Sequence, residues 1–412
     1  MKTSRTKKTA QTTPSKRKAA PPSAEVFSAF LRLGLTSFGG PIAHLGYFNV
    51  EFVRRRKWLD EDTFAQIVAL CLFLPGPASS QVAMIIGLIR AGALGAALAW
   101  LGFTLPSAIA LVAFAFGIAR IPGAATVPWI HGLLVAAVAV VAVAVANMYR
   151  SLCADVPRKA IALAAAAVVL FFPASAVVQL GLIAAGAVYG RFFIASSIRQ
   201  SEPIPVAGNR VSAALCAIAY IALLIGLPIT QRFVDNGPLK VFGAFYESGA
   251  LVFGGGHVVL PLLQARVVPP GWINSDAFLA GYGAAQAVPG PLFTFAAYLG
   301  AAMHGPVSGA GGAALALFAI YLPSFLLIAA VLPFWNGLFR STPLVAALQG
   351  VNAVVVGLLL AALYQPVWVS AVRVPPDVAL ALLAFLLLEV MKKPPWLVVI
   401  LSAFAAQLLN LH

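Results

Sequence analysis

Two stretches of this chain, residues 26–40 and 241–255, match each other without a gap, and the match continues along both halves. Trp58, Asp62 and Phe64 recur as Trp272, Asp276 and Phe278. The later anchors are Pro75-Gly76-Pro77 with Pro289-Gly290-Pro291, Leu105-Pro106-Ser107 with Leu322-Pro323-Ser324, and His131-Gly132 with Gln349-Gly350. The order is kept at offsets of 214 to 218 residues. The chain is therefore a fused duplication, and both halves should form the same kind of unit.

The composition places both halves in a membrane. Hydrophobic residues make up 61% of the chain and charged residues only 9%, whereas a soluble domain carries about 25% charged residues. The apolar runs are long and continuous, which favours helices over a β-barrel, where apolar residues alternate. We therefore predict an all-α polytopic membrane protein with about 12–13 transmembrane segments in two homologous halves.

The predicted segments divide as six, one and six. They are 26–48, 64–89, 93–119, 131–148, 160–172 and 174–193 in the first half, 211–229 between the halves, and 241–268, 277–303, 309–332, 344–364, 377–390 and 396–409 in the second. The expected domains are a basic cytoplasmic tail (1–24), a first transport domain (25–195), a linker with a connecting helix (196–238) and a second transport domain (239–412).

Charge patterning predicts the orientation of the halves. Seven of the 27 Lys and Arg residues lie in the first 18 positions, which predicts a cytoplasmic N-terminus. Arg54-Arg55-Arg56-Lys57 precedes Trp58, whereas the matched stretch before Trp272 carries no charge. Equivalent loops with opposite charge bias indicate inverted repeats with broken helices. A cytoplasmic tail and a cytoplasmic arginine loop cannot both hold if segment 26–48 is one ordinary span. The segment must then either enter the membrane and return to the same side, or lie partly in the interface. The sequence leaves both alternatives open.

Helix breaks recur at matched positions in both halves. One kind is Phe38-Gly39-Gly40-Pro41, matched by residues 253–256; the other is the Pro-Gly-Pro pair. Breaks at membrane depth free backbone groups that protein, water or a ligand must satisfy, and a helix N-terminus favours an anion. Ser79, Ser80 and Gln81 follow the first Pro-Gly-Pro, and Thr294 follows the second. The alternative is a structural kink without a ligand.

Ionisable residues inside apolar segments are the second signal, because they are costly there. Arg32 and Glu247 occupy the same position of the two halves. Arg32 suits an oxyanion, or its side chain snorkels to the interface. Glu247 carries a proton, or forms an ion pair with Arg32. His44 and His257 flank the glycine breaks, as proton carriers or as packing residues.

The matched stretches resemble the chromate ion transporter family in its long form, with two fused chromate-transport domains. The resemblance rests on LTSFGGPIAHLG at 35–46, FLPGPASSQ at 73–81, GFTLPS at 102–107, FGGGHVVLP at 253–261 and GAAQAVPGPLFT at 283–294, and covers about residues 24–410. It implies a bacterial plasma-membrane exporter of chromate that confers chromate resistance. The driving force would be the membrane potential or proton gradient, with sulfate as a related oxyanion.

The predicted site follows from these breaks and charges. The expected substrate-binding residues are Arg32, Ser37, Gly39, Gly40, His44, Pro75, Gly76, Pro77, Ser79, Ser80, Gln81, Gly254, Gly255, His257, Pro289, Gly290, Pro291 and Thr294, with Glu247 as the coupling residue. No Walker A, GxSxG, HExxH or Cys/His cluster occurs, so we expect no catalytic residue, cofactor or metal. The expected partners are the oxyanion and the lipid bilayer but no nucleic acid, and a homodimer stays open.

Two other functions fit part of the pattern. A flippase for an anionic lipid headgroup would use the same broken helices. A membrane-embedded enzyme would need a cluster of acids, His or a nucleophile at membrane depth, for which the sequence offers only isolated candidates such as Glu247 and Glu389.

The charge bias generates a topology prediction. Single cysteines at Arg55 and Gly271, in a background without Cys71, Cys153 and Cys216, should react with an impermeant maleimide from opposite sides of the membrane. The measurement is labelling of intact cells against labelling of inverted vesicles. If both positions react from the same side, the inverted-repeat prediction is wrong.

Overall fold

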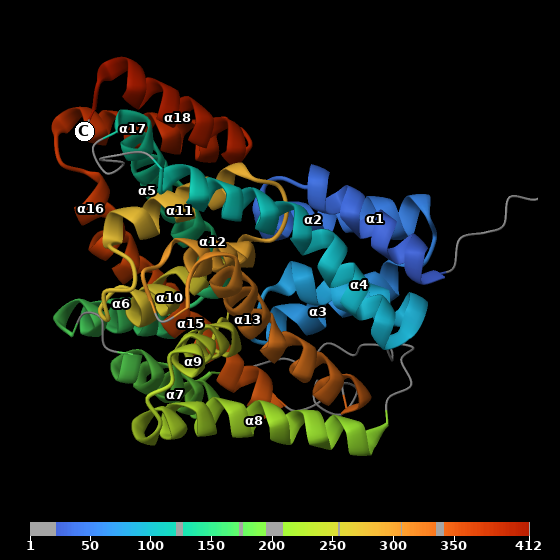
Figure 1. Ribbon diagram of the computed structural model, residues 1–412. Coiled ribbons are helices and arrows are strands. Elements are labelled where there is room, and N and C mark those ends of the chain that lie inside the picture. The colour runs from blue at the N-terminus through green and yellow to red at the C-terminus, as the bar shows by residue number, and fades with distance from the viewer. Residues whose placement is uncertain are drawn as a thin grey trace, which may run out of the picture.

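The computed structural model describes residues 22–120, 127–172, 176–194, 209–253, 256–305, 307–334 and 342–411. The predicted basic tail up to residue 21 and linker residues 195–208 lie outside these ranges. Every regular element within them is a helix, and most helices run along one common direction, from left to right in Figure 1. The all-α prediction is confirmed.

The first segment of each half is a hairpin of two short helices. In hairpin 1, α1 (Pro22–Thr36) turns at 37–39 into α2 (Gly40–Phe48), which a wider-wound stretch, η1 (Asn49–Arg55), continues. The ring of Phe30 lies 5.6 Å from that of Phe48, and Arg56 Nη1 donates to Glu25 Oε1 at 3.0 Å. The two ends of the segment are thus side by side. Segment 26–48 folds back on itself, as the re-entrant alternative requires.

Hairpin 2 follows the same plan around the first Pro-Gly-Pro. Its arms are α3 (Glu61–Phe73) and the first part of α4 (Ala78–Ile118). Asp60 caps α3 by accepting from Thr63 N at 2.7 Å. At the end of the second arm the Arg90 guanidinium lies 5.2 Å from the centre of the Trp58 ring, close to the start of the first arm. After Arg90 the backbone kinks at 91–92, and α4 continues as a long apolar helix.

The second half repeats both hairpins. Hairpin 3 comprises α9 (Gly237–Ala250), η3 (Gly256–Val258) and α10 (Val259–Val267). Hairpin 4 comprises α11 (Ser275–Ala287), η4 (Leu292–Thr294) and α12 (Phe295–Ala302), and His304 N donates to Trp272 O at 2.7 Å between its two ends. The helix α13 (Gly309–Val331) then corresponds to the second part of α4.

The hairpins of the two halves open in opposite directions. From Arg90, at the open end of hairpin 2, α4 runs 24 residues to Phe114, which is about 36 Å at 1.5 Å per residue. The Phe114 ring lies 5.9 Å from the ring of Tyr298, whose hydroxyl donates to Ala277 O near the open end of hairpin 4. The hairpin pairs are therefore antiparallel, the geometry that inverted repeats require.

The outer helices are exchanged between the halves. The long helix α5 (Pro128–Leu152) of the first half packs against α17 (Pro375–Phe385) and α18 (Pro395–Leu409) of the second. Its counterpart α15 (Thr342–Ala362) packs against α6 (Val156–Phe171) and α7 (Ala176–Phe193). A stretch of η6 (Leu363–Trp368) and α16 (Val369–Ala371) joins α15 to α17, which ends in η7 (Leu386–Val390). The long outer helix of each half therefore packs mainly against the last helices of the other half.

Helix α8 (Arg210–Phe233) crosses along the outside of the molecule, at the bottom of Figure 1. Ile218, Ile221 and Ile225 on it are more than half exposed, as expected of side chains that face lipid. Among the described residues, five helices are long and apolar enough to span a membrane: Ala78–Ile118, Pro128–Leu152, Arg210–Phe233, Gly309–Phe334 and Pro343–Ala371.

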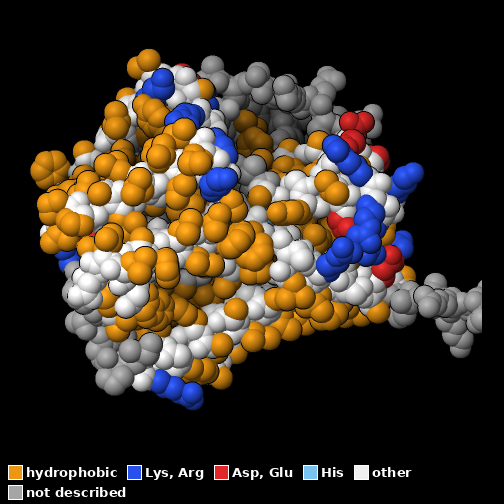
Figure 2. All heavy atoms as spheres, turned by 90° about the horizontal axis from the view of Figure 1, so that it is seen from above, with side chains coloured by type: hydrophobic (Ala, Val, Ile, Leu, Met, Phe, Trp, Pro, Cys, Tyr) orange, Lys and Arg blue, Asp and Glu red, His pale blue; other side chains and the backbone are white. Residues whose placement is uncertain are grey.

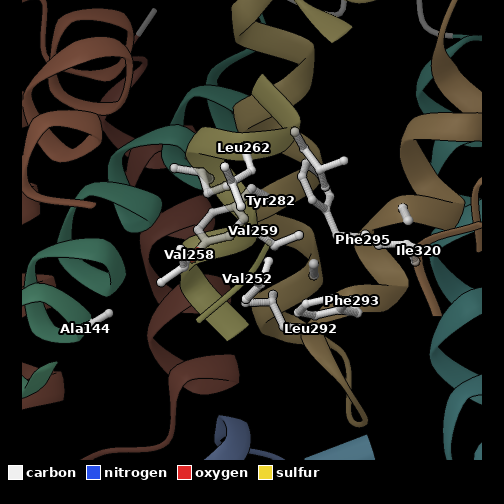
Figure 3. Close-up of a cluster of buried hydrophobic side chains, with 14 of the residues drawn as sticks. Ala144, Val252, Val258, Val259, Leu262, Tyr282, Leu292, Phe293, Phe295 and Ile320 are labelled. Carbon is white, nitrogen blue, oxygen red and sulfur yellow. The ribbon is translucent and has the colours of Figure 1, made fainter. Parts of the chain in front are cut away.

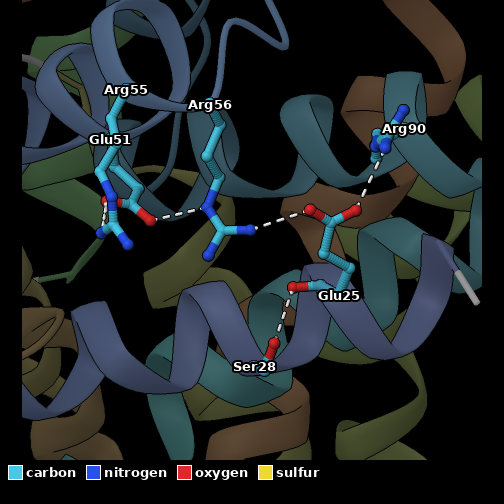
Figure 4. A network of polar contacts seen from close by, with 6 residues as sticks. All are labelled: Glu25, Ser28, Glu51, Arg55, Arg56 and Arg90. Atoms are coloured by element: carbon cyan, nitrogen blue, oxygen red, sulfur yellow. Dashed lines mark hydrogen bonds and ion pairs between the residues drawn. The ribbon is translucent and has the colours of Figure 1, made fainter. Parts of the chain in front are cut away.

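Charged side chains gather at the open end of hairpins 1 and 2, on the right of Figure 2, while hydrophobic side chains cover the middle. Figure 4 shows the network there. Glu25 accepts from Arg56 and from Arg90 Nη2, the latter at 3.1 Å, and so joins the two hairpins. Glu51, only 7% exposed, accepts from Arg55 and Arg56. This end is the basic face that the sequence predicts to be cytoplasmic.

The interior of the second half is apolar and closely packed. Figure 3 shows Val252, Val258 and Val259 of hairpin 3 against Tyr282 and Phe295 of hairpin 4. All five are fully buried. Backbone groups exposed by the helix breaks within this interior must find partners in the protein or in a ligand.

The hairpin geometry yields a prediction. Single cysteines at Ala24 and Lys57, which are both exposed at the two ends of hairpin 1, should react with an impermeant maleimide from the same side. An ordinary span would place them on opposite sides. Labelling of right-side-out against inverted vesicles distinguishes the two, and reaction from different sides would contradict the re-entrant hairpin.

Candidate anion site

The tips of the four hairpins meet in the middle of the molecule, and they carry most of the residues that the sequence singles out. The tip of hairpin 1 contains Ser37, Gly39 and Gly40. The tips of hairpins 2 and 4 are the Pro-Gly-Pro turns, Pro75-Gly76-Pro77 and Pro289-Gly290-Pro291. In hairpin 3, Gly254 and Gly255 lie outside the described residues, while Gly256 and His257 are described.

Backbone hydrogen bonds connect these tips crosswise between the halves. Gly76 N donates to Val252 O of hairpin 3 at 2.7 Å, and Gly290 N donates to Ser37 O of hairpin 1 at 2.9 Å. Each Pro-Gly-Pro turn thus satisfies a carbonyl that the break in the other half has freed. An unsatisfied group of this kind costs several kcal/mol in hydrocarbon, so the two bonds bind the halves together at their centre.

At the central glycine of each turn, Gly76 and Gly290, both the backbone conformation and the close neighbours exclude a side chain. Their φ angles are +121° at Gly76 and +102° at Gly290, a region that L side chains rarely adopt. A Cβ on Gly76 would lie 2.6 Å from Ser324 Oγ, and one on Gly290 would lie 2.8 Å from Ser107 Oγ. The matched Leu-Pro-Ser motifs therefore place one serine each against the turn of the opposite half.

His44 of α2 joins hairpins 1 and 2. Its Nε2 lies 3.2 Å from Ser37 O, and its Nδ1 lies 3.4 Å from Ser79 Oγ. His44 is 1% exposed, and its ring meets that of Phe103 edge-on at 5.2 Å. It contacts the carbonyl that also accepts from Gly290 N, so His44 lies at the point where three hairpins join.

The polar side chains after the first turn are occupied by protein groups. Gln81 Nε2 donates to Pro75 O at 2.7 Å and lies 3.3 Å from Ser324 Oγ. Ser80 Oγ lies 3.5 Å from Tyr321 Oη. We expected these side chains to present donors to an anion; in this structure Gln81 satisfies a carbonyl of the break, and Ser80 contacts a tyrosine of the other half. Their role in substrate binding stays a prediction.

The second half offers the open space. A cavity of about 20 Å³ is lined by Gly39, Gly40, Pro41, His257, Ala285, Gln286, Val288, Gly290, Leu292 and Pro395. His257 Nδ1 lies 2.7 Å from Tyr282 Oη, which fixes the ring, and Gln286 Nε2 has no partner among the described residues. Nor has Ser37 Oγ, which is fully buried. The volume is that of one or two water molecules, so this is a closed state of the site.

Thr294, the counterpart of the first-half polar cluster, donates from Oγ1 to Pro291 O at 2.7 Å. Like Gln81, it satisfies the carbonyl of its own turn. The two halves therefore use different side chains, Gln81 and Thr294, for the same local requirement.

Arg32 and Glu247 lie away from the tips. Arg32 is exposed on α1 and contacts none of the tip residues, so its predicted role as an anion ligand has no support from a contact. Glu247 is 3% exposed and forms an ion pair with Arg266 of α10. The alternative that Glu247 pairs with Arg32 is wrong, because hairpin 3 brings its own arginine to the carboxylate.

Sequence reasoning missed two kinds of residue here. Ser107 and Ser324 recur in a matched motif, and that recurrence was a usable signal. Gln286 was visible only as an amide three residues before the second turn. Among the described residues, no three His, Cys, Asp or Glu side chains form a group able to hold a metal ion.

Comparisons with known proteins agree with the duplicated geometry. The model of the family described as "Chromate transporter" matches twice, at residues 24–191 and 239–407. The chain belongs to the chromate transporter family. It is accordingly a multi-pass membrane transporter and not an enzyme, in the long form of the family with two domain copies.

Individual relatives extend over most of the chain. A chromate transport protein of Pseudomonas aeruginosa is 28% identical over 367 residues, 85% of this chain and 82% of the relative. One of Cupriavidus metallidurans is 26% identical over 374 residues, 88% and 86% of the two chains. An uncharacterized transporter of Methanocaldococcus jannaschii is 24% identical over 344 residues, 83% of each chain. No solved structure matches the chain significantly.

The crossed tips generate a stability prediction for this transporter. Gly290→Ala adds a Cβ to a residue at positive φ, which costs about 1–2 kcal/mol in strain, and presses it on Ser107 Oγ. The melting temperature of the purified protein in detergent should fall. The control is Gly117→Ala in α4, where nothing lies within 4 Å and helix propensity gains up to about 1 kcal/mol. Equal melting temperatures for the two variants would contradict the crossed-tip arrangement.

Proposed function

We propose that the chain exports chromate, and related tetrahedral oxyanions such as sulfate, across the bacterial plasma membrane and so confers chromate resistance. The observation that carries the proposal is the tip cavity, where backbone and amide donors of opposite halves face one space at the centre of a chromate transporter family member. The relatives named above as chromate transport proteins support the choice of anion.

The donors around the cavity suit a small anion. The helix α2 begins at Gly40 with no side-chain cap, so its positive dipole end would favour an anion, although Pro41 in its first turn has no N–H to donate. Gln286, which lines the cavity, adds Nε2 as a donor without a hydrogen-bond partner among the described residues. None of the residues that line the cavity is acidic, so no fixed negative charge opposes a dianion.

The crossed arrangement supports alternating access. The cavity lies between tips that belong to hairpins opening toward opposite ends of the molecule. Because it holds only one or two waters when closed, binding requires the tips of hairpins 1 and 4 to separate. Separation on one side at a time would expose the same donors first to one face and then to the other, as in other inverted-repeat transporters.

The direction of transport is part of the proposal. Arg54, Arg55, Arg56 and Arg90 gather at one end, and the positive-inside rule assigns this end and the N-terminus to the cytoplasm. A basic entrance would concentrate a dianion there before export.

Uptake of labelled chromate by everted vesicles tests the function. Vesicles that contain the protein should accumulate chromate when energised, and vesicles without it should not. Equal accumulation in both kinds of vesicle would reject chromate export. Growth tests give a second check. If the protein protects cells against wall-active antibiotics but not against chromate, export is also rejected and the lipid-headgroup flippase is favoured.

The cavity itself is tested by Gln286→Leu. Loss of one hydrogen bond to a charged group costs about 1.5–3 kcal/mol, which at 1.4 kcal/mol per decade raises the KM for chromate by about tenfold or more. The matched control is Gln407→Leu on the exposed end of α18, where the same change should leave the KM as it is. An unchanged KM for Gln286→Leu at normal expression would move the anion site away from this cavity.

A further inference from the structure

A buried imidazole–carboxylate pair lies outside the tip site, between the exchanged helices of the two halves. His131 on α5 and Asp377 on α17 approach to 2.9 Å, Nε2 to Oδ1. They are 2% and 0% exposed, so a net charge on the pair is held inside the protein. Uncompensated buried charge is costly, and a buried pair of this kind is weak evidence for a role in stability.

The hydrogen bonds of Asp377 define the state of the histidine. Its second oxygen, Oδ2, accepts from Arg373 N at 2.9 Å and from Val374 N at 3.1 Å. A carboxylate that accepts from two backbone N–H groups is held in its ionised form, so Nε2 of His131 carries the hydrogen that is donated to Oδ1. The other nitrogen, Nδ1, is then an acceptor. It is buried and has no partner among the described residues.

The side chain of His131 can be approached from the surface. A cavity of about 110 Å³ is lined by Ile118, Ile130, His131, Leu134, Asn274, Asp276, Ala277, Ala280 and Tyr298. Asn274 and Asp276 lie at the open end of hairpin 4 and are exposed or nearly so, while His131 lies at the inner wall. This is the end of the molecule opposite the basic face. The volume suffices for several waters, which conduct protons.

The charged groups around His131 are few. Asp377 comes from α17, Arg373 from the turn before it and Asp276 from α11, and Arg373 Nη2 pairs with Asp276 Oδ2 at 3.0 Å. Tyr298 of α12 donates its hydroxyl to Ala277 O. Helices α15, α16 and α18, which also pack on α5, carry no ionisable side chain, and Tyr364 of η6 is exposed. Proton uptake at Nδ1 therefore changes the net charge of one isolated pair from −1 to zero.

The duplication supplies an internal comparison. Gln349 occupies the position of His131 in the second half, and matching VPRK at 156–159 with VPPD at 374–377 places Lys159 opposite Asp377. The same frame therefore exists once with an imidazole, which can bind a proton, and once with an amide, which does not. Glutamine is a side chain that this position of the fold accepts.

A packed helix connects the pair with the tip cavity. Ala277 and Ala280 of α11 line the cavity beside His131, and Ala285 and Gln286 of the same helix line the tip cavity. Between them, α5 and α11 touch at backbone distance, because a Cβ on Gly283 would lie 2.6 Å from Leu133 O. A shift of α5 on protonation of His131 must therefore move α11 and with it the second Pro-Gly-Pro turn.

We propose that the His131–Asp377 pair is the proton-binding site of the transport cycle, loaded through the cavity at the face opposite the basic end. The inference rests on the proposed function and adds to it the coupling ion and the group that binds it. Protons that enter from the outer face bind Nδ1, α11 transmits the change to the tip cavity, and the anion leaves in the opposite direction.

The test uses the full chain, purified and reconstituted in proteoliposomes, as wild type and as His131→Gln. Two quantities are measured in each: counterflow of labelled chromate against internal chromate, which needs no net proton movement, and proton movement on addition of chromate, followed with an internal pH dye. Wild type should show both, and its net transport rate should depend on pH. His131→Gln should retain counterflow but lose the proton movement and the pH dependence.

Three further results have defined meanings. Asp377→Asn keeps an oxygen that can accept from Arg373 N and Val374 N, and it should lose proton movement in the same way. If His131→Gln moves protons as wild type does, or loses counterflow together with coupling, or if Glu247→Gln alone abolishes proton movement, the proposal is overturned. Wild-type protein without any chromate counterflow would instead refute the proposed function, which keeps the two failures distinct.

Discussion

The constraint on which this structure depends is that an interrupted helix in an apolar interior leaves backbone groups without partners. Four such interruptions form the hairpin tips, and their described residues pair crosswise between the halves. The amide of Gly76 reaches the carbonyl of Val252, and that of Gly290 reaches Ser37. The glycines are required because the turn leaves no room for a Cβ, and the serines at 107 and 324 occupy the space beside them. The four tips meet because the hairpins fold back, the halves run antiparallel and the outer helices are exchanged between them.

The sequence predicted the parts of this arrangement that repeat. Matching the halves identified both kinds of break, the membrane class and the family, because apolar runs and the Pro-Gly-Pro turns are local signals. It did not predict which groups would pair. Residues 76 and 252 belong to different halves, and no periodicity relates them. The partner of Glu247 was likewise missed, since Arg266 approaches it only after hairpin 3 folds back.

Side chains near a break are ambiguous for a related reason. The sequence indicated free hydrogen-bond donors at the start of a helix, at Ser79, Ser80 and Gln81. In the structure, however, Gln81 donates to the carbonyl of Pro75, which the helix break leaves without a helical partner. The sequence predicted Arg32 as an anion ligand, but its side chain lies on the exposed face of α1. Comparison of the halves shows where corresponding parts of the common frame carry different residues. These pairs are Gln81 and Thr294, Arg32 and Glu247, and His131 and Gln349. Such differences mark where a symmetric scaffold has acquired a directional function.

The crossed bonds also govern how the protein is made. The carbonyl of Ser37 emerges early from the ribosome, but its partner at Gly290 follows only after roughly 250 further residues, which takes about 10–50 s at ordinary rates of translation. During that time the nascent first half sits in the membrane with its tips unpaired. Insertion machinery, lipid headgroups or trapped water must shield them meanwhile. Truncation between the halves would therefore be expected to yield a product that quality-control proteases remove.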